Sequence, residues 1–147
     1  MKKDTIFTRL FLPVLAASLA FASPAMAHED DHEDTPLGKA MEQSSKALKS
    51  LRKMDKSDWA GAAKAARTAA DGARKAMEFE PALVKEMADG KEKTKAIADY
   101  RRMMGLSYAA LCELEIAYLE EDQAKVDAAM KKIKAGKKEG HKKYTDD

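Results

Sequence analysis

The sequence predicts an all-α protein, folded as an antiparallel up-down-up-down four-helix bundle. Apolar side chains recur at helical spacing in four segments, and most connections between these segments are short. No apolar alternation, hairpin dipeptide or strand-helix-strand rhythm is present. Because short connections place consecutive helices side by side in opposite directions, the segments predict a bundle around one core. The 147 residues leave room for a leader and a single domain, residues 36–147.

Residues 1–27 have the pattern of a cleaved secretory signal peptide. Three basic residues precede an apolar run over residues 10–22, and an A-x-A cleavage pattern ends at Ala27. A retained membrane anchor is the alternative, but Pro13 interrupts the run, which is shorter than the roughly 20 apolar residues that a span needs. We therefore expect the mature chain to begin at His28 and to reside in the periplasm.

An acidic tail, residues 28–35, follows the predicted cleavage site. It holds five carboxylates without helical periodicity, which predicts disorder. Its His28 and His32, with the new α-amine, could bind copper, nickel or zinc, although a solvated tail is the favoured interpretation. Loss of the leader removes three basic residues and one acidic residue from 27 Lys+Arg and 25 Asp+Glu. The mature net charge is then near zero, which argues against nucleic acid as a partner.

Two helices are expected in the first half of the domain. The first covers about residues 36–53, after the N-cap candidate Thr35. Its inward positions follow a four-three rhythm in which Ser44 is the only polar break. The apolar members of this stripe are Leu37, Met41, Leu48 and Leu51. The second helix covers about residues 58–77 after the cap candidate Ser57, and its alanine-rich face allows close helix approach or leaves space.

Two more helices follow a long connection, residues 80–90, that has room for one helical turn. The third covers about residues 92–119, with the inward positions Ile97, Tyr100, Met104, Ser107, Leu111, Leu114 and Tyr118. The fourth follows the N-cap candidate Asp122, with the inward positions Val126, Met130, Ile133, Gly140 and Tyr144. Its two interior glycines, Gly136 and Gly140, each cost a helix about 0.5–1 kcal/mol against alanine, so they suggest space for a ligand.

Topology brings two potential metal ligands to one end of such a bundle. Met41 lies near the start of the first helix, and His141 lies near the end of the last. A thioether and an imidazole are an axial pair for six-coordinate haem iron in electron-transfer proteins. Ser44, the alanine-rich second helix and the two glycines could leave a slot for the porphyrin, and Lys137 could meet a propionate. Alternatively, Met41 is core filler and His141 is a surface residue at a helix C-terminus.

Two segments carry a resemblance to a known family. Met41-Glu42 with Ala47-Leu48-Lys49, and His141-Lys142-Lys143-Tyr144, are similar to the first-helix and last-helix motifs of cytochrome b(562). The interval from Asp99-Tyr100-Arg101 to His141 also resembles the spacing in that family. The resemblance implies a periplasmic four-helix bundle with one non-covalent b-type haem (haem b). It further implies Met41 and His141 as axial ligands and Tyr100 as an aromatic against the haem.

On these grounds we expect a periplasmic one-electron carrier that is not an enzyme. No nucleophile with a base, phosphate loop or pair of catalytic carboxylates stands out in the sequence. A basic patch that could steer an unidentified acidic redox partner is formed by Lys137, Lys138, Lys142 and Lys143. No membrane contact is expected after cleavage. The alternative is a haem-free helical bundle that acts as a periplasmic interaction or metal-buffering protein.

A single cysteine, Cys112, bounds the covalent chemistry of the chain. One cysteine excludes an intramolecular disulfide and a haem attachment of the C-x-x-C-H kind. Cys112 falls off the inward stripe of its helix, so we expect it to be partly exposed. An inert helical residue is the favoured interpretation, and a disulfide dimer through Cys112 is the alternative in an oxidising compartment.

Overall fold

Five helices form the part of the chain that the computed structural model describes, residues 35–145. They are α1 (Pro36–Leu51), α2 (Trp59–Ala76), α3 (Ala82–Lys85), α4 (Lys91–Leu119) and α5 (Gln123–Tyr144). No strand occurs among these residues, so the all-α prediction is confirmed. None of these helices is both long and apolar enough to cross a membrane. The predicted leader, residues 1–27, and the acidic residues 28–34 lie outside the described residues.

Side-chain caps define the starts of the long helices. The Thr35 hydroxyl accepts a hydrogen bond from the Gly38 amide at 2.9 Å, and Asp122 accepts one from the Lys125 amide at 3.1 Å, as the sequence predicts. The predicted cap Ser57 is wrong. Asp58 caps α2 through the Gly61 amide at 2.8 Å, while the Ser57 hydroxyl donates to Asp55 at 2.6 Å. A carboxylate one residue later satisfies the free amides of the first turn equally well.

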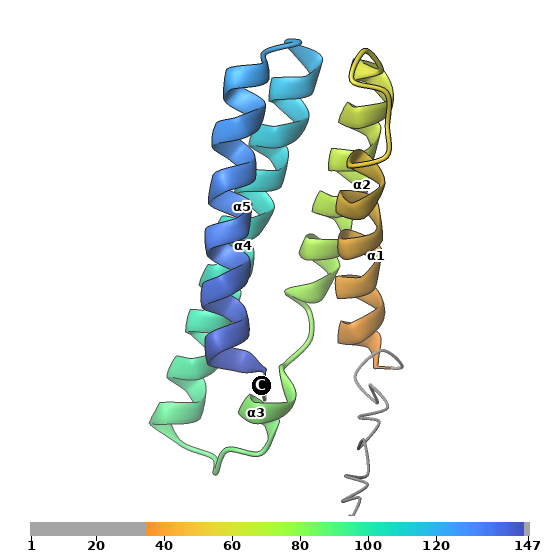
Figure 1. The fold of residues 1–147 in the computed structure, drawn as a ribbon. Coiled ribbons are helices and arrows are strands. Elements are labelled where there is room, and N and C mark those ends of the chain that lie inside the picture. Colours follow the sequence, from red (N-terminus) through yellow and green to blue (C-terminus); the bar gives the residue numbers. More distant parts are fainter. Residues whose placement is uncertain (1–34, 146–147) are drawn as a thin grey trace, which may run out of the picture.

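The four long helices lie side by side, and each runs opposite to the long helix before it (Figure 1). α1 packs on α2, α2 on α4, and α4 on α5, while the short α3 touches α4 and α5. No Cα atom of α1 lies within 8 Å of a Cα atom of α5. Figure 1 shows that the start of α1 and the end of α5 lie at one end of the molecule, here called the His141 end. The opposite end, where α2 begins, is called the Trp59 end.

Small side chains let α1 and α2 approach closely. A Cβ atom added at Gly72 would lie 2.7 Å from the Ala40 carbonyl oxygen and 2.8 Å from the Ser44 amide nitrogen. The buried residues of α1 are accordingly Ala40, Ser44 and Ala47. The predicted inward stripe is confirmed at Ser44, which is buried, and at its leucines, which are half-buried and pack against the core clusters. It is wrong at Met41, which is 37% exposed. Close backbone approach favours small side chains at the contact and moves large ones to its edge.

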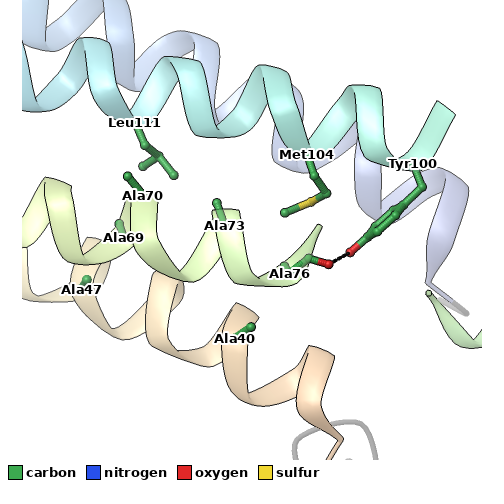
Figure 2. Close-up of a cluster of buried hydrophobic side chains, with 9 residues drawn as sticks. All are labelled: Ala40, Ala47, Ala69, Ala70, Ala73, Ala76, Tyr100, Met104 and Leu111. Carbon is green, nitrogen blue, oxygen red and sulfur yellow. Dashed lines mark hydrogen bonds between the residues drawn. The ribbon is translucent and has the colours of Figure 1, made fainter. Parts of the chain in front are cut away.

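The buried side chains form two clusters. The first, shown in Figure 2, places Tyr100, Met104 and Leu111 of α4 over the alanines of α2, with α1 on the far side. The second lies toward the Trp59 end and consists of Ala66, Leu114, Ala117, Val126 and Ala129. No residue of α5 after Ala129 is fully buried. Half-buried side chains therefore attach the last part of α5 to its neighbours.

Candidate functional site

Met41 and His141 lie at the same end of the molecule, on two helices that have no Cα atoms within 8 Å of each other. Met41 is on α1 and belongs to neither buried cluster, since 37% of its surface is exposed. His141 is on the last turn of α5 and is half-buried. The interpretation of Met41 as core filler is therefore wrong. Each residue sits beside the buried face of its own helix.

His141 lines an open hollow in the surface of α5. The walls come from α5 and its C-cap alone: Lys134, Lys137, Lys138, His141, Lys142 and Thr145. Four of these residues are lysines, and none of the four forms an ion pair with a described residue. Lys143, which the sequence places in the same patch, instead pairs with Asp99 at 3.0 Å. The imidazole is therefore surrounded by uncompensated positive charge, which favours an anionic group there.

Tyr100 is a structural anchor in the described fold. Its ring is 6% exposed, and its hydroxyl donates a hydrogen bond to the Ala76 carbonyl oxygen at 3.0 Å (Figure 2). Its ring meets that of Tyr144 edge-on, with the centroids 5.4 Å apart. Burial, with a smaller contribution from Tyr144, raises the pKa of Tyr100 to about 12. Tyr100 thus ties the end of α2 to α4 and also braces α5.

Sequence reasoning missed the group that holds the end of α5. Asp99 accepts hydrogen bonds from the Tyr144 hydroxyl at 2.9 Å, the Lys143 ammonium at 3.0 Å and the Arg102 guanidinium at 2.9 Å. These hydrogen bonds, led by the one from Lys143, hold the pKa of Asp99 well below its usual range. His141 lies one turn before Tyr144, so this network positions it. A carboxylate beside a tyrosine was visible in the sequence, but its two partners on α5 lie more than forty positions away.

Small residues expected to open a porphyrin slot have two different roles. Ser44 is buried in the close contact between α1 and α2, so the prediction that it helps form a slot is wrong. Gly136 and Gly140 lie on the side of α5 that faces α4, where added Cβ atoms would lie 3.6 Å from the Ser107 hydroxyl and 3.8 Å from the Met103 methyl. These are ordinary contact distances, so the packing of this chain leaves room for alanine at both positions.

The donor set fits a cofactor that takes two axial ligands. Among the described residues, no group of three or more histidines, cysteines or carboxylates could hold a metal ion. A partly exposed thioether and a partly exposed imidazole on two separated helices fit a haem iron, which takes its other four ligands from the porphyrin. No family model matches the chain, and neither a curated protein nor a solved structure matches it. The site is therefore supported by the placement of its own residues.

Proposed function

We propose that this protein is a periplasmic electron carrier that binds one non-covalent b-type haem between Met41 and His141. The proposal includes an antiparallel up-down-up-down four-helix bundle whose α1 and α5 sides receive the haem. One observation supports it: a partly exposed thioether and a half-buried imidazole sit at the same end, on two helices that have no Cα atoms within 8 Å of each other. Periplasmic location rests on the predicted leader, residues 1–27.

The side chains around the proposed site have distinct tasks. Met41 and His141 would supply the axial ligands, and Met/His ligation raises the reduction potential of a haem. The bound haem would supply one-electron iron chemistry. Leu37, half-buried on α1, would contribute apolar cover, while the Lys137 ammonium would neutralise a carboxylate at the edge of the site. With both axial positions taken by protein ligands, no position remains for a substrate, which fits a carrier better than an enzyme.

The uncompensated lysines on α5 suit an acidic redox partner. Lys134, Lys137, Lys138 and Lys142 surround His141 without carboxylate partners in the described chain. Charges of one sign beside a site accelerate the encounter with a protein of opposite charge. Because salt screens exposed charges over about 8–10 Å, the rate of electron transfer to such a partner should fall as ionic strength rises.

A visible absorption spectrum after haem titration tests the proposal. We expect sharp low-spin bands on reduction, which are lost in both Met41→Ala and His141→Ala. Met54→Ala is the matched control, because Met54 is a half-buried methionine in the turn after α1. Its spectrum should be unchanged. A chain that stays helical and binds no haem would overturn the proposal and leave a haem-free interaction or metal-buffering protein.

A further inference from the structure

The outer face of α4 exposes large apolar side chains. Leu106 is 60% exposed, Ile116 is 53% exposed and Leu119 is 64% exposed. Apart from Met41, these are the exposed large apolar residues of the described chain. Ile116 and Leu119 lie one turn apart on the same face of α4, whereas Leu106 lies farther along and round the helix. An exposed apolar pair without a partner in the described chain marks a candidate interface between proteins.

Two of these side chains, Ile116 and Leu119, belong to a regular pattern on α4 that does not include Leu106. Positions alternate by four and three residues along a stripe, here called the outer stripe, which consists of Ala98, Arg102, Gly105, Ala109, Cys112, Ile116 and Leu119. Every member is exposed or half-buried. The opposite face of α4 holds its buried residues, including Tyr100, Leu111 and Leu114. One face of α4 therefore packs in the core, while the other has the four-three spacing with which helices pair in coiled coils.

The outer stripe complements a reversed copy of itself. Small residues, Gly105 and Ala109, precede Cys112, and large residues, Ile116 and Leu119, follow it. In an antiparallel pair centred on Cys112, Leu119 of one copy would lie opposite Gly105 of the other. Ile116 would lie opposite Ala109, to within the rise of one residue. A Cβ atom added at Gly105 meets no atom within 4 Å, so space for an incoming side chain exists there.

Charged residues at the two ends of the stripe also favour an antiparallel arrangement of the two α4 helices. Arg101 flanks the first part of the stripe and Glu121 follows its end, and neither forms an ion pair with a described residue. An antiparallel pair would bring Arg101 of each copy to within about one helical turn of Glu121 of the other. A parallel pair would place like charges together, which disfavours that arrangement.

We propose that the outer stripe of α4 is the interface of a symmetric antiparallel homodimer, with its two-fold axis beside Cys112. A two-fold axis uses the same patch on both copies, which a self-complementary stripe satisfies. The interface would consist of one helix pair, at the small end of specific interfaces, so dimerisation should depend on concentration. No residue of the stripe belongs to the proposed haem site, so either proposal can fail while the other stands.

Sedimentation velocity of the reduced protein over a range of concentrations tests the interface. Ile116→Lys and Leu119→Lys should each weaken the dimer by about tenfold or more, because an apolar side chain in the interface becomes a charged one. Ala128→Lys adds the same charge to an exposed position of α5 and is the matched control. Circular dichroism should report unchanged helix in all three. A monomer at every concentration, or equal weakening by Ala128→Lys, would overturn the interface.

Cross-linking with diamide tests the antiparallel register. The two Cys112 thiols would lose two protons and two electrons to diamide, which becomes the hydrazine, and a disulfide would join the copies. The comparison variant is Cys112→Ser with Ala98→Cys. In an antiparallel pair, position 98 of each copy lies 14 residues from the two-fold axis, on opposite sides of it. At 1.5 Å per residue, the two new cysteines would lie about 42 Å apart. No cross-link is expected there. A parallel pair would cross-link through residue 98, and that result would overturn the proposal.

A charge reversal sharpens the same test. Arg101→Glu should weaken the dimer several-fold. The acidic side chain at position 101 of each copy would then lie near Glu121 of the other copy, and the two like charges would repel. Adding Glu121→Arg to the same chain should restore the affinity, since opposite charges again meet in the antiparallel register. Failure of the second substitution to restore dimerisation would contradict that register.

Discussion

The Trp59 end and the His141 end of this molecule are held together by different interactions. At the Trp59 end, Leu114 is fully buried and Val126 is 4% exposed, with Trp59 and Tyr118 packed beside them. At the His141 end, the cluster is mainly alanine, and the end of α5 is held through Tyr144 and Asp99. One end is closed by large apolar side chains. The other leaves two potential metal ligands partly exposed, as a cofactor site requires.

The largest expected loss of stability comes from a substitution at the Trp59 end. Leu114→Ala should lower the free energy of unfolding by about 3–4 kcal/mol, because it removes a fully buried side chain and leaves a cavity among well-packed neighbours. Leu106→Ala is the matched control on the same helix, since Leu106 is 60% exposed. It should change stability by less than about 0.5 kcal/mol. Urea unfolding measures both, and equal losses would contradict the assignment of the core to this end.

A pair of glycine substitutions separates the two sides of the molecule. Gly72→Ala should destabilise the protein by about 2 kcal/mol, because the new methyl group would lie 2.7 Å from backbone of α1. Gly136→Ala should instead stabilise it by about 0.5–1 kcal/mol, since the methyl group makes ordinary contacts and alanine favours the helix. Thermal unfolding followed by circular dichroism gives both signs. Stabilisation by Gly72→Ala would show that α1 and α2 are less tightly packed.

The tyrosines of the two ends give a smaller contrast. Tyr100→Phe should cost about 1 kcal/mol, because the Ala76 carbonyl oxygen loses its donor while the ring still packs. Tyr118→Phe should have almost no effect, since the Tyr118 hydroxyl has no hydrogen-bond partner among the described residues. Urea unfolding of both variants tests this difference. An equal cost would mean that the hydroxyl of Tyr100 contributes nothing specific at the His141 end.

Alkaline pH should weaken the His141 end gradually. Burial raises the pKa of Tyr100, and of Tyr144, to about 12, while an unfolded tyrosine ionises near 10. The unfolded state therefore loses its protons first, so stability is complete below pH 10 and falls as the pH rises toward 12. Ultraviolet titration of tyrosinate, together with urea unfolding at each pH, measures the effect. Tyr100→Phe should show a shallower fall, and an unchanged slope would contradict the assignment.

Much of the local structure followed from the sequence. The four long helices, the helical turn between α2 and α4 and the caps Thr35 and Asp122 were all predictable, because each depends on residues within a few positions of one another. The partial exposure of Cys112 also followed from its place on the helix. The predicted cap Ser57 differed by one residue, since two neighbouring side chains can each serve as a cap.

Other features required partners from distant parts of the chain. The burial of Ala40, Ser44 and Ala47 in place of the leucines of α1 depends on the small residues that α2 presents. The Tyr100 bond to Ala76 and the partners of Asp99 join separate helices. Such pairs cannot be predicted from one helix, because they depend on the rotation and separation of two.

The sequence by itself determined that this chain is all-α and placed the ends of the long helices to within about two residues. It also identified Met41 and His141 as a pair of candidate ligands, from their positions on the first and last helices. Only the tertiary structure decided that α1 packs closely on α2, with no Cα atom within 8 Å of a Cα atom of α5, and that both candidate ligands are partly exposed. The physical reason is that helical periodicity is set by spacing along the chain, whereas helix separation is set by the sizes of the side chains on both facing surfaces.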